Sequence, residues 1–218
     1  MPLFKAMVVR VREVALSVAN EGQKTPRPRY GAVRKGYWIA TMLALASLTV
    51  AARAFELGSP DMIPGQQLSN KFVFNGFDCH GENISPALTW TEPPDGTKSF
   101  ALMVHDPDAN TGGAGIWHWV VVNIPATARG IDQGAGTTDG AQLPSGSKQI
   151  STDYGKPGWG GPCPPKGHKP HSYNFTLYAL KVDRLDLPPT ATASHAGFMI
   201  NRNALGQARL SISFGRTE

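Results

Sequence analysis

Residues 116–124, Ile-Trp-His-Trp-Val-Val-Val-Asn-Ile, decide the predicted fold. Side chains alternate between the two faces of a β-strand, and here both alternating sets are large and mostly apolar. We therefore expect a strand that is covered on both sides, in the middle of a sheet. By the two-residue period, one face carries Ile116, His118, Val120, Val122 and Ile124, and the other carries Trp117, Trp119 and Val121.

The same alternation predicts two more long strands, at 100–106 and 171–180. Shorter strands are expected at 71–74, 87–90 and 209–214. The faces predicted to be apolar carry Phe100, Leu102, Val104 and Asp106 in the first long strand, and His171, Tyr173, Phe175, Leu177 and Ala179 in the second.

Together with these strands, the remaining sequence predicts a mainly β single domain with one or two peripheral helices. A helix is expected at 191–205, where apolar residues recur without strict alternation. Long loops rich in Gly and Pro are expected at 106–115 and 153–170. Loops of this length in a compact domain are usually functional or disordered, so both are candidate parts of a site.

The composition indicates a folded domain. Hydrophobic residues make up 41% and charged residues 17% of the 218 residues, which is enough apolar material for one core. The basic excess is confined to residues 1–54, with nine Lys or Arg and two Glu, a net +7. Residues 55–218 hold 12 basic and 14 acidic residues, a net −2. Nucleic-acid binding needs a concentrated basic face, so we expect none.

Residues 34–54 predict a secretory signal peptide. Arg34 and Lys35 precede 17 uncharged residues at 36–52, and Ala52 and Ala54 place small residues at alternate positions at the end of this segment. The mature domain then covers 55–218, is periplasmic or secreted, and has no stable membrane span. The alternative is a membrane anchor through an uncleaved 36–52 segment, although a spanning helix needs about 20 apolar residues. Residues 1–33 are expected to be a disordered extension or the result of a start codon assigned too early.

The mature part contains two cysteines, Cys79 and Cys163. An even count in a chain expected to enter an oxidising compartment favours one disulfide between them. Two independent buried thiols are the alternative. Neither cysteine belongs to a C-x-x-C motif, so no redox or zinc role is expected.

Three titratable side chains, Asp106, His118 and His171, lie in phase with apolar neighbours near the ends of the long strands. A buried carboxylate needs partners, because burying a lone charge is costly. A histidine is a suitable partner, since a carboxylate fixes its tautomer and holds its charge. Together the three would form a small polar pocket able to hold an anion. The alternative is three separate residues, each satisfied under its own loop.

The charge of this pocket depends on two opposing effects on the histidine pKa. Asp106 would raise the pKa of a neighbouring histidine, whereas burial would lower it. The sequence does not decide whether the histidine pKa is raised or lowered. If an imidazolium attracts the ligand, anion binding weakens as pH rises through the histidine pKa, which is near 6.5 when unperturbed.

Several short motifs occur in order along the chain, and together they resemble the phosphatidylethanolamine-binding protein family, in particular its bacterial Raf-kinase-inhibitor-like branch. The resemblance covers residues 55–214. The motifs are Asn-Ile-Ser-Pro-Ala-Leu at 83–88, Asp-Pro-Asp-Ala at 106–109, Trp-His-Trp-Val-Val-Val-Asn-Ile-Pro at 117–125, Gly-Pro-Cys-Pro-Pro-Lys-Gly at 161–167, His-Ser-Tyr at 171–173 and Gly-Phe-Met-Ile-Asn at 197–201.

The resemblance implies a central antiparallel sheet with a second, smaller sheet, and a pocket that accepts phosphate-like head groups. It selects the same aspartate and histidines as the alternation argument. The residues that it assigns to ligand binding are Asp106, Asp108, His118, His171 and Tyr173, with Gly161 and Pro162 at the rim.

The implied function is an exported, non-enzymatic binding protein for a small anionic or phosphorylated ligand, and an inhibitor-like regulator of a protein partner. No catalytic residue, cofactor or metal is expected. Residues 106–117 begin like a calcium-binding EF-hand loop, but Thr111 and Trp117 stand where glycine and glutamate are required. The alternative function is a hydrolase or other enzyme that uses Asp106, His118 and His171.

Two positions depart from the family pattern. Asn110 replaces a usual proline in the loop after Asp108, and Ser172 replaces a usual arginine between His171 and Tyr173. The first change frees the loop. The second removes a permanently charged donor able to pair with an acidic partner, so we expect a looser pocket than in relatives.

Removal of residues 1–54 should leave the domain intact, because that segment carries the whole basic excess and no strand pattern that matches the domain. A chain that begins at Phe55 is expected to be soluble and to melt in one cooperative transition, as measured by circular dichroism. Aggregation of this shorter chain, with the full-length chain well behaved, would show that the leader packs on the domain.

Overall fold

The computed structural model describes residues 54–217. The predicted extension at 1–33 and the signal peptide at 34–54, apart from Ala54, lie outside the described residues. Within 54–217, no helix has the length and apolar character needed to cross a membrane.

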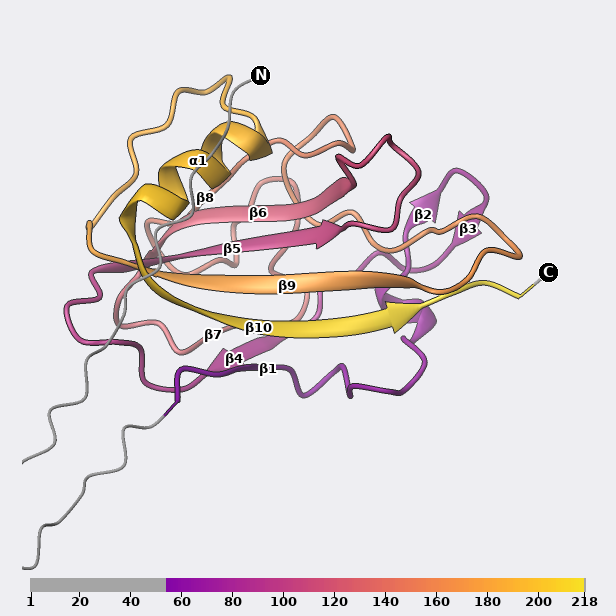
Figure 1. The fold of residues 1–218 in the computed structure, drawn as a ribbon, viewed down its shortest axis with the longest axis horizontal. Helices are drawn as coiled ribbons and strands as arrows, with labels where there is room; N and C mark the ends of the chain where they lie inside the picture. Colours follow the sequence, from indigo (N-terminus) through magenta and orange to yellow (C-terminus); the bar gives the residue numbers. More distant parts are fainter. Residues whose placement is uncertain (1–53, 218) are drawn as a thin grey trace, which may run out of the picture. The chain divides into compact units, whose positions relative to one another are not determined.

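A five-stranded antiparallel sheet forms the centre of the domain (Figure 1). The predicted strands at 116–124, 100–106 and 171–180 are confirmed as its three middle strands, within one residue at each end. In spatial order the strands are β10 (Ala204–Phe214), β9 (His171–Leu180), β5 (Ser99–Asp106), β6 (Ile116–Pro125) and β8 (Lys148–Gln149).

Smaller sheets complete the β structure. Three short strands form one of them, β1 (Leu57–Gly58), β4 (Leu88–Trp90) and β7 (Gly130–Ile131), and β2 (Asn75–Gly76) pairs with β3 (Cys79–His80). Leu88 and Trp90 pack in one core with Phe100 and Leu102 of β5. The mainly β, antiparallel fold class is therefore confirmed.

The helix α1 (Ala193–Asn203) covers the other face of the central sheet. Its Ala196 and Ile200 are fully buried in a second core with Met103 and Val122, and α1 lies opposite the small sheet in Figure 1. The Thr192 side chain caps the helix by accepting a hydrogen bond from the backbone N–H of His195 at 3.2 Å. The helix predicted at 191–205 ends earlier, because the chain turns into β10 at Ala204.

The strand predicted at 71–74 is wrong. Asn70–Phe72 form a short 3₁₀ helix, η1, whose turn is closed by the backbone N–H of Phe72 bonding to the carbonyl of Ser69 at 3.1 Å. The consecutive residues Phe72 and Val73 are both buried. A run of apolar residues this short does not distinguish a strand from a buried turn.

The face predicted for His118 is also wrong, because β6 is irregular where it pairs with β5. Trp117 pairs with His105 and Trp119 with Val104, so His118 is an extra residue in a β-bulge. Its ring therefore lies on the same side as Trp119. Val120 and Val122, its predicted companions, face the α1 core instead.

The face predicted for Ile124 is wrong as well, because β6 contains a second irregularity. Leu102 pairs with Val121 and Phe100 with Ile124, which inserts an extra residue on β6 near Asn123. Asn123 has φ +59°, and its side-chain carbonyl accepts the backbone N–H of Leu185 at 2.7 Å. Ile124 therefore joins the core of the small sheet instead of the α1 core.

Cys79 of β3 and Cys163 of the 153–170 loop form a disulfide, with Cα atoms 6.0 Å apart. The predicted pairing is confirmed in this structure. The bond joins residues 84 positions apart, so it closes a large part of the domain into one loop. A cross-link over such a distance strongly restricts the unfolded chain.

Replacing both cysteines by serine should lower the free energy of unfolding by about 4–5 kcal/mol, the loss expected for a loop of this length from chain entropy. Urea unfolding of the parent and the double variant measures the difference. If mass spectrometry finds both cysteines freely alkylated in the parent protein without reductant, the pairing itself is contradicted.

Candidate functional site

A cavity of about 300 Å³ opens where β5, β6 and β9 meet the long loops at one end of the central sheet. Side chains from several distant segments line it. They are Phe77, Asp106, Ala109, Asn110, Thr111, Ile116, His118, Asp153, Tyr154, Cys163, Pro164, Pro165, His168, His171 and Tyr173. Four predicted site residues, Asp106, His118, His171 and Tyr173, are thus brought together.

Asp106 is only 3% exposed, and its carboxylate is held by three N–H groups. Oδ1 accepts from the backbone of Asp108 at 2.9 Å and of Ala109 at 3.1 Å, and Oδ2 accepts from Nδ1 of His171 at 2.8 Å. These contacts compensate for the loss of water around the charge. They also fix the His171 ring, since its Nδ1 carries the donated proton.

His118 lies on the bulge of β6 and is buried. Its Nδ1 donates to the carbonyl oxygen of Gly160 at 2.6 Å, so in the neutral ring Nε2 is an acceptor. Nε2 is buried and has no hydrogen-bond partner among the described residues. Burial lowers the His118 pKa from 6.5 to about 4, outweighing the Gly160 carbonyl and the Asp106 charge, which raise it. His118 is therefore neutral at pH 7.

Tyr173 contacts His118 edge-on, with ring centroids 5.1 Å apart. Its hydroxyl is buried and also lacks a hydrogen-bond partner in the described part of the chain. Burial raises the Tyr173 pKa above its ordinary value of 10, and the negative charge of Asp106 raises it further. The hydroxyl keeps its proton at neutral pH and can donate it.

Asp108, which was also predicted to bind the ligand, is not among the residues that line the cavity. Its Oδ2 accepts the backbone N–H of Ser172 at 2.8 Å, and its Oδ1 lies 3.7 Å from Nζ of Lys169. The Ser172 N–H is the main reason that the Asp108 pKa is lowered. Asp108 thus ties the 106–110 turn to β9, and a backbone donor holds it although arginine is absent at position 172.

Gly161 and Pro162 do not line the cavity either. The Gly161 N–H donates to Oδ1 of Asn83 at 2.8 Å, and its carbonyl accepts the Tyr154 hydroxyl at 2.9 Å. The Pro162 carbonyl accepts the backbone N–H of Phe74 at 3.1 Å. Both residues brace the loop behind the cavity, and the rim begins at the next residue, Cys163.

Sequence reasoning missed two aromatic residues of the cavity, Tyr154 and Phe77. Tyr154 packs edge-on against Phe74, with ring centroids 4.7 Å apart, and lies beside His118. Phe77 has φ +57° at the turn between β2 and β3, and its side chain is 84% exposed. The Gly/Pro-rich composition indicated the loop that carries Tyr154, but no periodicity distinguishes an aromatic residue within a loop.

Potential metal ligands gather at one place within residues 54–217, where side-chain atoms of Asp78, Cys79 and Cys163 lie within 4.8 Å of one another. Both sulfur atoms belong to the disulfide. A disulfide sulfur carries no thiolate to bind a metal, so this group does not fit a metal centre in the oxidised protein.

The pKa of His118 predicts an acid-sensitive domain. Between pH 6.5 and about 4 the unfolded histidine is protonated while the folded one is not. The contribution of neutral His118 to the free energy of unfolding is complete above pH 6.5. It is lost as pH falls toward 4, and the loss amounts to roughly 3 kcal/mol. Urea unfolding across this range should show a flatter pH dependence for His118→Gln than for the parent. The exposed-residue control His195→Gln should follow the parent, and a His118→Gln curve parallel to the parent would contradict this assignment.

Comparison with known proteins gives the family. The family described as phosphatidylethanolamine-binding protein matches residues 58–215. The Escherichia coli proteins UPF0098 YbcL and UPF0098 YbhB are 45% and 44% identical to the chain, over 79% and 73% of it and 94% and 99% of their own lengths. A putative lipoprotein of Mycobacterium tuberculosis, LppC, is 42% identical over 78% of this chain and 74% of its own.

Solved structures agree with the sequence matches. The crystal structure of E. coli YbcL, described as a member of the mammalian PEBP family, has a TM-score of 0.71 and covers 74% of this chain and 98% of its own. A PEBP homologue from Chlamydia trachomatis, 26% identical, has a TM-score of 0.63 and covers 76% of this chain and 99% of its own. The chain therefore belongs to the phosphatidylethanolamine-binding protein family.

Proposed function

We propose that this protein is an exported, non-enzymatic binding protein whose cavity takes a small phosphorylated head group in a proton-bearing form. One observation carries the proposal. The rings of His118 and Tyr173 are in edge-on contact at the cavity, and the acceptor Nε2 of the first and the hydroxyl of the second are buried without partners among the described residues. Unpaired buried polar groups are costly, and a ligand with both an acceptor and a donor would satisfy them.

The charge of the cavity limits how much negative charge a bound ligand can carry. None of its lining residues is Lys or Arg, whereas Asp106 and Asp153 are acids. A phosphate dianion would face the Asp106 carboxylate with little positive charge to offset the repulsion. A phosphomonoester monoanion carries one charge less. Its P–OH group can donate to Nε2 of His118, and one of its other oxygens can accept from the Tyr173 hydroxyl.

The mouth of the cavity suits the organic part of such an ester. Phe77, Pro164 and Pro165 line it with apolar surface, and Asp153 adds one carboxylate. An exposed aromatic ring beside a polar floor can cover an alkyl group, and a carboxylate can pair with an ammonium group. Phosphoethanolamine combines these features with a proton-bearing phosphate, so it is the first ligand to examine.

Three features support export. The 34–54 segment predicts a signal peptide, the structure contains a disulfide, and one relative is named a putative lipoprotein. Disulfides persist in oxidising compartments. We therefore assign the protein to the periplasm or the outside of the cell, with an anchor through an uncleaved 36–52 segment as the alternative. Regulation of a protein partner through the loops around the cavity is a further part of the proposal.

Binding of monomethyl phosphate should weaken between about pH 5.5 and 8 on the order of a hundredfold, because the monoanion disappears above its second pKa near 6. His118 stays neutral throughout this range. Dimethyl phosphate, which carries one charge but no proton, should bind at least tenfold more weakly at pH 5.5, the loss of one hydrogen bond to a charged ligand. Isothermal titration calorimetry measures both. Equal affinity for the two esters would contradict the proton requirement and favour attraction by a charged histidine.

Two cavity variants test the assigned atoms. His118→Ala and Tyr173→Phe should each weaken monomethyl phosphate binding by roughly tenfold or more, while the exposed-residue control His195→Ala should not. Release of phosphate from a phosphoester panel that disappears in His118→Ala would replace the binding function with an enzymatic one. A stable protein complex that survives His118→Ala would show that a partner binds independently of the cavity.

A further inference from the structure

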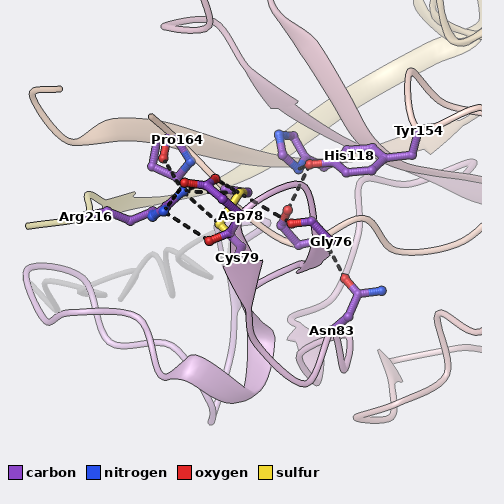
Figure 2. The surroundings of a disulfide bond; sticks show 10 residues. Gly76, Asp78, Cys79, Asn83, His118, Tyr154, Pro164 and Arg216 are labelled. Atoms are coloured by element: carbon purple, nitrogen blue, oxygen red, sulfur yellow. Dashed lines mark hydrogen bonds and ion pairs between the residues drawn. A yellow bond between two sulfur atoms is a disulfide. The ribbon is translucent and has the colours of Figure 1, made fainter. Parts of the chain in front are cut away.

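The Cys79–Cys163 disulfide lies beside a guanidinium group. Nη1 of Arg216 is 3.1 Å from Sγ of Cys79 and 3.5 Å from Sγ of Cys163. Figure 2 shows the Arg216 side chain directed at Cys79, with Asp78 and Pro164 around it. A cation at this distance stabilises a thiolate, and thiolates are the reactive form of cysteine.

The guanidinium is held in place independently of the sulfur atoms. Nη1 and Nη2 each donate to the Asp78 carboxylate at 2.8 Å, and Nη1 also donates to the carbonyl of Pro164 at 3.2 Å. The backbone carbonyl of Arg216 accepts the N–H of Gly167 at 3.2 Å. Arg216 therefore has partners that keep its charge at the sulfur atoms when the S–S bond is broken.

Asp78 does not cancel this charge completely. The pKa of Asp78 is held at about 2, mainly by its hydrogen bonds to Arg216, so it is ionised. Its side chain is 67% exposed, whereas that of Arg216 is only 11% exposed. Water screens the exposed carboxylate more than the nearly buried guanidinium. Oδ1 of Asp78 also lies 4.0 Å from Sγ of Cys163, farther than Nη1 of Arg216 at 3.5 Å, so both distance and screening favour the guanidinium over the carboxylate at the sulfur atoms.

The two sulfur atoms differ in access. Cys79 is 4% exposed and belongs to the hydrophobic core, whereas Cys163 is partly exposed and lines the cavity. A small reagent that enters the cavity therefore reaches Cys163 first. In thiol–disulfide exchange, the attacked sulfur forms the mixed disulfide and the other sulfur leaves as thiolate.

We propose that this disulfide is a thiol-exchange site that accepts a small thiol on Cys163, with Cys79 as the leaving group. The attacking thiolate forms a bond to Sγ of Cys163. The S–S bond breaks, and its electron pair stays on Sγ of Cys79 as a thiolate beside Arg216. One disulfide replaces another, so no separate oxidant or reductant is consumed, and the proton of the incoming thiol goes to solvent. The absence of a C-x-x-C motif is no obstacle, because Arg216 supplies the activation.

Reaction of the full-length chain with reduced glutathione under native conditions tests the site. After a short incubation, the protein is unfolded in denaturant with excess N-ethylmaleimide, and peptide mass spectrometry should find glutathione on Cys163 and N-ethylmaleimide on Cys79. Glutathione mainly on Cys79, or an adduct that forms no faster than global unfolding, would overturn the proposal. The reaction does not depend on phosphate binding, so this result is separate from that of the proposed function.

Arg216 variants test the leaving-group role. Arg216→Gln should slow adduct formation about tenfold, since it removes the cation beside the leaving sulfur, whereas Arg216→Lys should keep most of the rate. The exposed-residue control Arg202→Gln should react like the parent. Faster reaction of Arg216→Gln would show that the guanidinium only shields the bond. As a second measurement, the Cys79 thiol in Cys163→Ser should have a pKa roughly one unit below the ordinary value near 8.5, and an ordinary or higher pKa would overturn the role of Arg216.

Discussion

The buried carboxylate of Asp106 is the constraint on which the site depends. A carboxyl group that is 3% exposed must exchange its water for protein donors, and it does so with two backbone N–H groups and His171. The three donors come from two elements. The backbone donors close the turn after β5, and the histidine fixes the end of β9. The floor of the cavity is therefore set by the requirement to satisfy one charge.

This requirement explains why the polar groups of the cavity are not strongly basic. Asp106 uses His171 as its partner, and burial keeps His118 neutral. In the proposed binding function, this part of the cavity offers a ligand one acceptor and one donor, from His118 and Tyr173, instead of a cluster of cations. The wall has a separate chemistry, because Cys163 carries the disulfide and Arg216 lies behind it. In the two proposals, the same cavity therefore serves a binding site and an exchange site with different chemistry.

The sequence patterns predicted most of the central sheet but failed where strands are irregular. The alternation at 100–106 and 171–180 gave the correct faces, because β5 and β9 pair without a shift between Ser99 and His105. The alternation at 116–124 gave the wrong face for His118, because β6 contains two irregularities in its pairing with β5. A bulge depends on the partner strand, and a periodicity within one segment contains no information about that partner.

The sequence by itself determined the fold class, the family and the identity of four cavity residues, since these follow from local alternation and from motifs along the chain. Only the tertiary structure decided what those residues can do. Burial made His118 neutral, the carbonyl of Gly160 left its Nε2 as the acceptor, and Asp108 accepts the backbone N–H of Ser172. The tertiary structure also placed Arg216 beside the disulfide and in contact with Asp78, which is 138 residues before Arg216 in the sequence. Protonation and reactivity depend on burial and on charges close in space, and these are properties of contacts that only folding creates.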